Sequence, residues 1–429
     1  MFIQASKKPC IMFDGGASKN TLYEASMKER FLPKHSLVII MICFFLGDFS
    51  VTASPLFALK VSNECGACHT PGRTQRPVLE RRCTLDCQGC HIDPSGAGPR
   101  NQWGAYFLND QLATVNFIKP QDPLDDTSRF DVHVDSRYIQ RQVGNKQKTF
   151  PMATEFSLRI RPLIYWLHLS YQGVLLGRAG DGSLRNPEKV AYRYQEKYSL
   201  MIDQLPLNLY VRAFRGPAVY GLRHSNHSRW IRERIGLNQF ALIDGVAFGG
   251  TPTVPFFHFS VMQGDPQVAE ENKQHGSSFH GGFRGVTAGW HLNLSYWKTK
   301  SKKSQIEMKA LGGGLKILDL VLMGEKNWRD VTAISLNSQE QSELQDPFLR
   351  VHPSSVISDY SVSYVGIGGV IFGVVLEELV DDSIHSLRKS IFLDLHPVPY
   401  LQLEYWYRQE TGDRDLEDQL ALIHTYFDF

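Results

Sequence analysis

The chain has 429 residues, and its 46 lysines and arginines nearly balance its 44 aspartates and glutamates, which leaves a formal net charge of +2. Nucleic-acid-binding proteins usually carry a clear basic excess, so nucleic-acid binding is not expected here. The longest apolar run, residues 37–46, is ten residues long, whereas a membrane-spanning helix needs about 20. A bundle of membrane helices is thereby excluded, and a soluble protein and a membrane β-barrel both remain open.

Residues 1–53 have the pattern of a secretory signal. The apolar run follows the basic side chains Lys28, Arg30 and Lys34 and precedes small residues around Ala53 that suit a signal peptidase. Because Met27 stands just before the basic residues, we expect that translation begins there or that residues 1–26 are dispensable. Cleavage near Ala53 would leave a mature chain of about 376 residues.

Five cysteines lie within residues 65–90, and four of them form two C-x-x-C-H motifs. The first motif consists of Cys65, Cys68 and His69, and the second consists of Cys87, Cys90 and His91. This spacing is typical of c-type haem attachment, because the two thiols reach both vinyl groups of one porphyrin and the adjacent histidine ligates the iron. A zinc site, a thioredoxin-like pair and a disulfide are alternatives, but two such motifs behind an export signal favour two covalent haems. Cys83 has no assigned role.

Each haem iron needs a second axial ligand unless it stays five-coordinate or takes a lysine or terminal amine. Residues 54–128, the haem segment and its linker, contain no Met and no His outside the two motifs. We therefore expect distal ligands from residue 129 onward and do not expect the haem segment to function alone. The candidates, which lie on predicted inner strand faces or in one long loop, are His133, His168, His224, His227 and His258.

Residues 129–429 alternate between apolar and polar side chains, which is the period of a β-strand with one apolar face. In residues 163–171, for example, Leu167 and Leu169 share one face and His168 lies on the other. We predict about sixteen strands, at 129–143, 149–161, 163–174, 191–203, 205–214, 240–249, 254–263, 281–289, 290–299, 305–313, 314–324, 356–366, 368–378, 388–397, 399–409 and 417–428. Many have about ten residues, the length of a tilted strand that crosses a bilayer.

The predicted connections support a barrel. Short links at 161–162, 203–205, 250–253, 289–290, 312–314 and 397–398 alternate with connections that include the long ones 175–190, 215–239, 264–280 and 325–355. Short turns at one rim and long loops at the other are typical of outer-membrane barrels. A soluble propeller would show a repeat of about 40–50 residues, which we do not find, and a sandwich does not predict alternating links. We therefore predict an all-β transmembrane barrel of about 16 antiparallel strands with a small N-terminal dihaem segment.

If the apolar strand faces meet lipid, the polar faces point into the lumen. His168, His291 and His424 then lie inside, together with charged residues such as Arg159 and Arg408. Most of the charges are expected to be hydrated or to brace the interior, and a lone histidine is more often structural than a ligand. The 17 tyrosines and 7 tryptophans would supply the aromatic girdles at the two interfaces.

In its two haem motifs, its barrel pattern and its terminal Phe429, the chain resembles the fused cytochrome–porin proteins of metal-oxidising and metal-reducing bacteria. The resemblance covers nearly the whole mature chain in architecture, although the iron-oxidising members carry one C-x-x-C-H and this chain carries two. It implies an electron conduit in the bacterial outer membrane, with the haem segment in the lumen or on the periplasmic side and no catalytic acid or base. The implied partners are outer-membrane lipid, a periplasmic cytochrome or other redox carrier, and an extracellular electron donor or acceptor. A solute-conducting porin with a periplasmic dihaem sensing or docking segment is the alternative, as is a surface metal-ion oxidase or reductase.

Overall fold

The computed structural model describes one compact unit that lies within residues 48–429. The residues described are 112–115, 130–160, 166–179, 190–222, 224, 228–237, 242–250, 254–264, 270, 273–285, 289–333, 354–381, 385–412 and 415–428. The predicted signal, both haem motifs with Cys83, and His227 lie outside the described residues.

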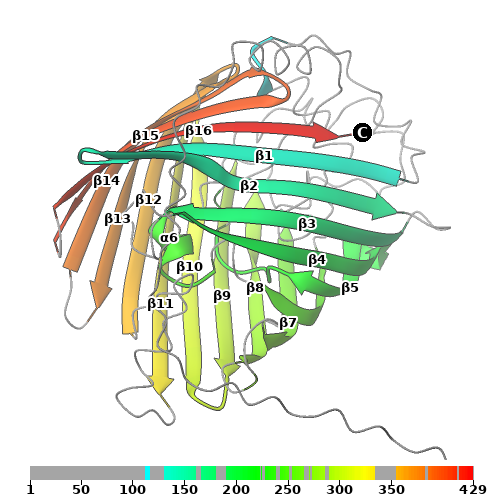
Figure 1. Ribbon diagram of the computed structural model, residues 1–429. Coiled ribbons are helices and arrows are strands. Elements are labelled where there is room, and N and C mark those ends of the chain that lie inside the picture. The colour runs from blue at the N-terminus through cyan, green and yellow to red at the C-terminus, as the bar shows by residue number, and fades with distance from the viewer. Residues whose placement is uncertain are drawn as a thin grey trace, which may run out of the picture. The chain divides into compact units, whose positions relative to one another are not determined.

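The described residues contain sixteen antiparallel strands that close into one barrel, which confirms the predicted fold class and strand number (Figure 1). The strands are β1 (Phe130–Val143), β2 (Lys146–Ile160), β3 (Leu167–Ala179), β4 (Val190–Leu205), β5 (Leu209–Gly216), β6 (Ile243–Gly250), β7 (Pro255–Gly264), β8 (His275–Gly285), β9 (Trp290–Lys300), β10 (Ser304–Ile317), β11 (Leu320–Ala333), β12 (Ser354–Ile367), β13 (Val370–Asp381), β14 (His385–Val398), β15 (Leu401–Thr411) and β16 (Leu416–Asp428). Each strand pairs with its sequence neighbours, and β1 pairs with β16 to close the barrel.

Alternation of side chains decides which face of each strand points outward. In β9, Leu292 and Leu294 are exposed on the outside, whereas His291 and Asn293 are buried on the inside. The pattern arises because successive side chains of a strand point to opposite faces of the sheet. The barrel therefore has an apolar outer face, and its inner face carries most of the polar side chains of the strands.

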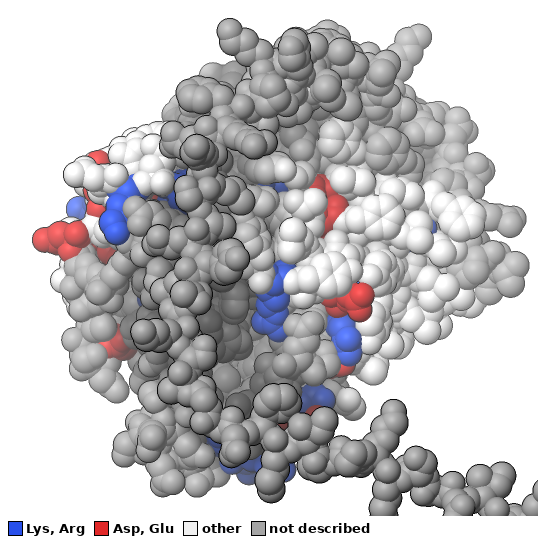
Figure 2. All heavy atoms as spheres, viewed as in Figure 1, with Lys and Arg blue, Asp and Glu red and all other residues white. Residues whose placement is uncertain are grey.

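The outer face is rich in large apolar side chains, and most of the described surface in Figure 2 is uncharged. Exposed aromatic residues occur towards both ends of the strands: Phe130, Phe283 and Trp290 at one end, Tyr192 and Trp328 towards the other. This arrangement matches the predicted girdles and is typical of barrels that sit in a membrane. No helix among the described residues is long and apolar enough to span a membrane.

The two rims of the barrel differ in their connections. One rim, here called the short-turn rim, joins each even strand to the next odd strand by links such as residues 206–208, 318–319, 368–369 and 399–400, the first of them the 3₁₀ helix η4 (Pro206–Asn208). The opposite rim, the long-loop rim, includes the connections 217–242 and 334–353 between consecutive strands. Both ends of the barrel sheet, Phe130 and Asp428, lie at the short-turn rim, because β1 begins and β16 ends there.

One predicted turn is wrong. Residues 312–314 lie inside β10, and the chain instead reverses at Leu318 and Asp319. Leu318 adopts a positive φ of 52°, a conformation that few L-residues adopt. A leucine therefore gives no turn signal in the sequence, whereas the three glycines at 312–314 do. The three glycines are therefore part of the barrel wall.

Candidate functional site

The lumen is the candidate site, and a long connection enters it. The described residues between β5 and β6 fold inside the barrel, and their short helix α6 (Trp230–Glu233) lies against β12 and β13 (Figure 1). Trp230 is fully buried there, and Tyr220 packs edge-on against Trp297 of β9. We call residues 217–242 the lumen loop.

The first part of the lumen loop is hydrogen-bonded to β9 and β11. The Tyr220 hydroxyl donates to Asn327 Oδ1 over 3.0 Å, the Gly221 N–H donates to Ser295 Oγ over 2.9 Å, and the Leu222 N–H donates to the carboxylate of Glu325. Gly221 has a φ of +60°, and a Cβ there would lie 2.5 Å from a Glu325 oxygen. Only glycine fits this close approach of the loop to the wall.

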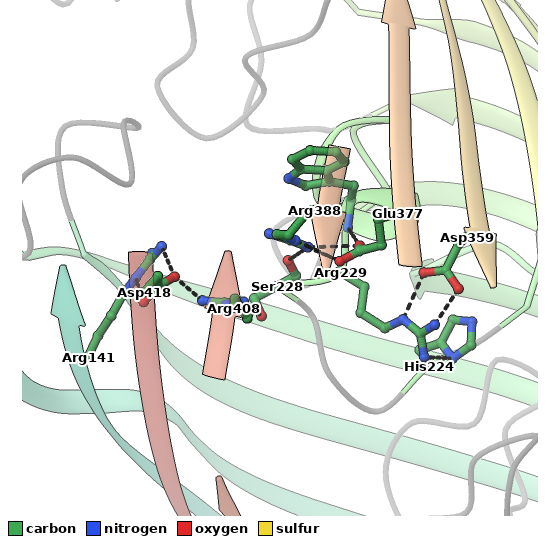
Figure 3. A network of polar contacts seen from close by, with 10 residues as sticks. Arg141, His224, Ser228, Arg229, Asp359, Glu377, Arg388, Arg408 and Asp418 are labelled. Carbon is green, nitrogen blue, oxygen red and sulfur yellow. Dashed lines mark hydrogen bonds and ion pairs between the residues drawn. The ribbon is translucent and has the colours of Figure 1, made fainter. Parts of the chain in front are cut away.

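The second part of the lumen loop is held by charged side chains (Figure 3). Arg229 donates through Nε to Asp359 Oδ2 over 2.8 Å, forms a second bond to the same carboxylate, and donates to His224 Nδ1 over 2.9 Å. The Trp230 N–H donates to Glu377 Oε1 over 2.5 Å. Burial, with the cations of Arg229 and Arg232 nearby, lowers the pKa of His224 well below 6.5, so His224 is neutral and accepts the arginine proton.

Further arginines extend this set of contacts along the wall. Arg388 pairs with Glu377 at 2.6 and 2.7 Å and donates to the backbone oxygen of Ser228 over 2.9 Å. Arg408 donates to Ser228 Oγ over 2.6 Å and shares the carboxylate of Asp418 with an arginine of β1. We call the set formed by Arg141, His224, Ser228, Arg229, Asp359, Glu377, Arg388, Arg408 and Asp418 the plug network. Of the lumen charges expected from the sequence to be hydrated or to brace the interior, Arg408 takes part in this network.

Histidines gather in the other half of the lumen. Seven buried histidines point inward from the strands, and each lies no more than five residues from the short-turn end of its strand: His133, His168, His258, His280, His291, His396 and His424. Their inward position follows from the alternation of each strand. The half of the lumen next to the short-turn rim therefore carries all of the inward-facing strand histidines that the structure describes.

Several of these histidines have defined partners. His168 Nε2 lies 3.1 Å from Asp203 Oδ1, and His424 Nε2 lies 2.8 Å from Asp135 Oδ2. His258 Nδ1 is 2.8 Å from the hydroxyl of Tyr210, and the His258 ring stacks on that of His280 at 5.9 Å. Among the described residues, neither ring nitrogen of His291 has a hydrogen-bond partner.

The predicted distal candidates have these positions: His133, His168 and His258 face the lumen, and His224 is buried in the lumen loop. His291 and His424 also face inward, as the alternation predicts. His280 was missed because β8 starts six residues before its predicted start, in a stretch of glycines and serines that gives a weak strand signal. His396 was missed although its strand alternates clearly. A role of any of them as a haem ligand stays a prediction.

An apolar cluster lies on the inner wall between β11 and β2, and it contains a residue from outside the barrel sheet. Its members are Leu112, Ile139, Phe150, Met152, Val321, Met323, Val365, Ile371, Val375, Phe392, Trp406, Leu420, Leu422 and Tyr426. Leu112 belongs to the predicted haem segment and is only 1% exposed. The backbone N–H groups of Thr114 and Val115 donate to the oxygens of His396 and Pro397, over 2.9 and 3.1 Å. Residues 112–115 are thus docked in the barrel at its short-turn rim.

The described residues contain no group of three or more His, Cys, Asp or Glu side chains that could together hold a metal ion. A single histidine suits the remaining axial position of a haem that a C-x-x-C-H motif already holds through its own thiols and histidine.

No protein-family model matches the sequence, and a search of curated proteins found no relative. Solved structures are similar in fold. A loop-deletion mutant of OmpT, an outer membrane protein of Vibrio cholerae, matches 70% of this chain and 99% of its own at 9% identity, with a TM-score of 0.50. An anion-selective porin from Comamonas acidovorans matches 70% of this chain and 98% of its own at 9% identity, with a TM-score of 0.47. The chain has the 16-strand β-barrel fold of outer-membrane porins.

Proposed function

We propose that this protein is an electron conduit in the bacterial outer membrane, in which two covalent c-type haems are held in or at the lumen of the barrel. The observation that carries the proposal is the docking of residues 112–115 at the short-turn rim, with Leu112 buried in the apolar cluster of the inner wall. These residues follow the second C-x-x-C-H motif by about twenty positions, so their docking would hold the haem segment close to one mouth of the lumen. The membrane location is supported by the apolar outer face and the aromatic girdles.

The wall of such a barrel is an insulator about 25 Å tall, so electrons need redox centres inside it. Bound haems would supply one-electron transfer. The chain's own residues would exclude water and fix the segment: the apolar cluster packs Leu112, and the plug network holds the lumen loop across the other half of the lumen. Short turns are periplasmic in barrels of this kind. We therefore place a periplasmic cytochrome or other redox carrier at the short-turn rim and the extracellular donor or acceptor at the long-loop rim.

The inner wall supports this reading over an open pore. Water-filled porins have polar interiors, whereas Ile371, Phe392, Trp406 and Tyr426 all face the lumen here and are 9% exposed or less. An apolar inner wall of this extent is unfavourable next to water and favourable next to a packed segment or a porphyrin. The lumen loop further reduces the open cross-section.

A solute-conducting porin with a dihaem segment at its periplasmic mouth is the second candidate. It is favoured by the porin-like fold and by the arginine-rich plug network, which would attract anions to the lumen. The two candidates differ in what crosses the membrane, namely electrons alone or dissolved molecules.

The test uses the full chain in liposomes that contain a reduced dye, with ferric citrate outside. The conduit predicts dye oxidation without solute swelling. The Cys65→Ser/Cys68→Ser and Cys87→Ser/Cys90→Ser variants, each lacking one haem motif, should lose this electron transfer while the barrel still assembles. Cys83→Ser is the matched control, because Cys83 lies between the motifs without belonging to either.

Each of three results would overturn the conduit. The first is swelling in sugar solutions with no dye oxidation, which would establish the porin instead. The second is a pyridine haemochrome assay that finds no covalent haem in the chain from outer-membrane fractions. Dye oxidation that survives removal of both motifs would also contradict it, because the electrons would then not pass through the haems.

A further inference from the structure

The outer face of β9 to β14 carries its charged side chains unevenly. Towards the short-turn rim the outward side chains are mostly large and apolar, as Leu292, Leu315 and Phe372 are. Towards the long-loop rim the same strands present lysines and carboxylates. These are Lys298, Lys300, Glu307, Lys309, Lys326, Asp330, Glu378 and Lys389. Because lysines outnumber carboxylates in this set, this part of the described surface attracts anions.

A cavity of about 350 Å³ lies within this charged region, and we call it the rim pocket. It is lined from the four adjacent strands β10 to β13, and its outward lining residues include Glu307, Lys309, Trp328, Asp330, Val356 and Val380. Neighbouring strands are about 4.8 Å apart, so three such spacings make the lining about 14 Å wide. Trp328 and Val380 are 40% and 39% exposed. The rim pocket therefore combines apolar surface, a cation and carboxylates on the outer face of the barrel.

Three lysines on adjacent strands supply the cations at the rim pocket. Nζ of Lys309 lies 3.0 Å from Oε1 of Glu307, and Nζ of Lys298 lies 3.9 Å from Oε2 of the same carboxylate. Nζ of Lys326 lies 5.6 Å from the centre of the Trp328 ring. The Lys309 side chain is 63% exposed, and exposed ion pairs of this kind contribute little to stability. Because each ammonium has three donor hydrogens, Lys298 and Lys309 can also donate to the oxygens of a phosphate.

The carboxylates of the rim pocket decide which anion it fits. Asp330 Oδ1 accepts from the hydroxyl of Ser354 over 2.6 Å, and Ser354 also lines the rim pocket. A carboxylate accepts several hydrogen bonds, so Asp330 and Glu307 can also accept from hydroxyl groups of a ligand. A ligand that offered only phosphate would be repelled by them. A headgroup with both phosphates and hydroxyls satisfies both kinds of side chain, and the exposed indole of Trp328 offers an apolar face for a sugar ring.

The strand register places the rim pocket directly above an apolar part of the wall. Lys309 pairs with Trp328, and the next outward pair towards the short-turn rim is Leu311 with Lys326. Leu311 also pairs with Leu294 of β9, and both leucines are 51% exposed. Acyl chains packed on these leucines would bring their headgroup to the level of Trp328, where aromatic residues of membrane proteins meet the interface. Because short turns are periplasmic, this lipid would belong to the outer leaflet.

We propose that the rim pocket binds the phosphorylated sugar headgroup of a glycolipid in the outer leaflet. Lys298 and Lys309 donate to its phosphate, while Glu307 and Asp330 accept from its sugar hydroxyls. Trp328 packs on the apolar side of a sugar ring. The inference takes from the proposed function the membrane location and the orientation of the barrel, and it does not depend on the haems.

The test titrates the full chain in detergent micelles with lipid A, a diphosphorylated glucosamine disaccharide that carries acyl chains, and counts bound lipid by native mass spectrometry. Wild type should retain lipid A more tightly than phosphatidylglycerol, which has a phosphate but no sugar. A lysine beside an anionic headgroup contributes about five-fold in affinity. Lys309→Gln should therefore weaken lipid A binding about five-fold, and Lys298→Gln/Lys309→Gln about 25-fold.

Two matched controls separate the rim pocket from the general charge of the surface. Lys389→Gln removes an outward lysine of β14 that does not line the rim pocket, and it should bind lipid A as wild type does. Monophosphoryl lipid A keeps the sugars but lacks one phosphate, so wild type should bind it more weakly and the lysine variants should lose less. Gel mobility of the folded barrel confirms that each variant assembles.

Equal binding of lipid A by wild type and by Lys298→Gln/Lys309→Gln would overturn the site. If that double variant fails to assemble, Lys309→Gln decides in the same way. Phosphatidylglycerol bound as tightly as lipid A would overturn the glycolipid as the occupant and indicate an anionic phospholipid instead. None of these results alters the haem count or the electron transfer, so the conduit would stand. A chain that binds lipid A but carries no covalent haem would overturn the conduit alone.

Discussion

The long-loop half and the short-turn half of the lumen are lined by the same strands but carry different chemistry. In the long-loop half, arginines and carboxylates of the plug network pair with each other and with the lumen loop, as Arg388 does with Glu377 and Ser228. The short-turn half contains seven inward histidines, and three of them, His133, His396 and His424, are on strands that also contribute to the apolar cluster around Leu112. One half therefore completes its contacts within the barrel, and the other holds residues of the predicted haem segment.

The two halves of the lumen are suited to different roles. Buried arginine–carboxylate pairs are costly to break and fix one arrangement, which suits a loop that must stay in place. Imidazole and apolar side chains can contact an occupant without the loss of a buried arginine–carboxylate pair, which suits a wall that accepts an occupant. The contrast predicts that damage to the long-loop half mainly lowers the stability of the barrel and its loop. Damage to the short-turn half should mainly change what is bound there.

The largest expected effect in stability comes from Arg388→Met. It leaves Glu377 buried at 1% exposure without its cation, and removing one partner of a buried ion pair costs about 3–5 kcal/mol. The urea midpoint for unfolding of the barrel, followed by circular dichroism and gel mobility, should fall accordingly. The double variant Glu377→Gln/Arg388→Met should recover most of the loss, because the glutamine can still accept from the Trp230 N–H. Lys389→Met, on the outward face of the same strand, is the matched control. A wild-type midpoint in Arg388→Met would contradict the structural role of the plug network.

A smaller and more local effect is expected from Leu112→Ala, which tests the short-turn half. Truncating a fully buried leucine costs on the order of 2–5 kcal/mol. Here the loss should lower the free energy that docks residues 112–115 and should leave the stability of the barrel unchanged. Amide hydrogen exchange at Thr114 and Val115, whose N–H groups donate to His396 and Pro397, should accelerate by tens to thousands of fold. The barrel strands should exchange as before.

Val115→Ala serves as the control for this experiment, because the Val115 side chain is 43% exposed and its loss should leave exchange at Thr114 almost unchanged. Equal exchange in Leu112→Ala and wild type would mean that the apolar cluster does not hold the segment. The short-turn half would then not be the half that holds residues 112–115 through its apolar side chains.

The barrel was predictable from sequence, because alternation is a local property of each strand. The period of two in segments such as 290–299 predicted both the strand and the inward position of His291. The turn at Leu318 and the start of β8 were not predictable in this way, since glycine and serine in residues 276–282 weaken the strand signal and Leu318 gives no turn signal.

The contents of the lumen were less accessible from sequence. The sequence indicates loop histidines as candidate ligands, but the lumen loop is held inside by pairs such as Arg229 with Asp359, which are 130 positions apart. Docking of Leu112 depends likewise on a cluster drawn from eight strands, six of which, β11 to β16, lie about 200 or more positions along the chain from Leu112. Contacts of this kind depend on the strand register, which a single sequence does not reveal.

The smallest expected effect concerns pH and the lumen loop. Inside the lumen the pKa of His224 lies well below 6.5, first because the side chain is buried and second because Arg229 and Arg232 are close. A loop released into water would regain the ordinary pKa. Above about pH 6.5 neither state is protonated at His224, and the pH has no effect through it. As the pH falls below that value, the released loop takes up a proton that the buried loop cannot, so acid favours release.

Amide exchange at Leu222 and Trp230, whose N–H groups donate to wall carboxylates, should therefore rise a few-fold more in wild type than in His224→Gln as the pH falls from about 7.5 to about 5, after correction for intrinsic rates. Glutamine can still accept from Arg229 through its side-chain oxygen but does not titrate, so it separates the charge of His224 from its hydrogen bond. The same pH change at Thr114 and Val115 should show no such difference between the two proteins, because His224 belongs to the plug network and not to the short-turn half. A difference of equal size at both places would mean that the two halves of the lumen are coupled and respond to acid as one unit.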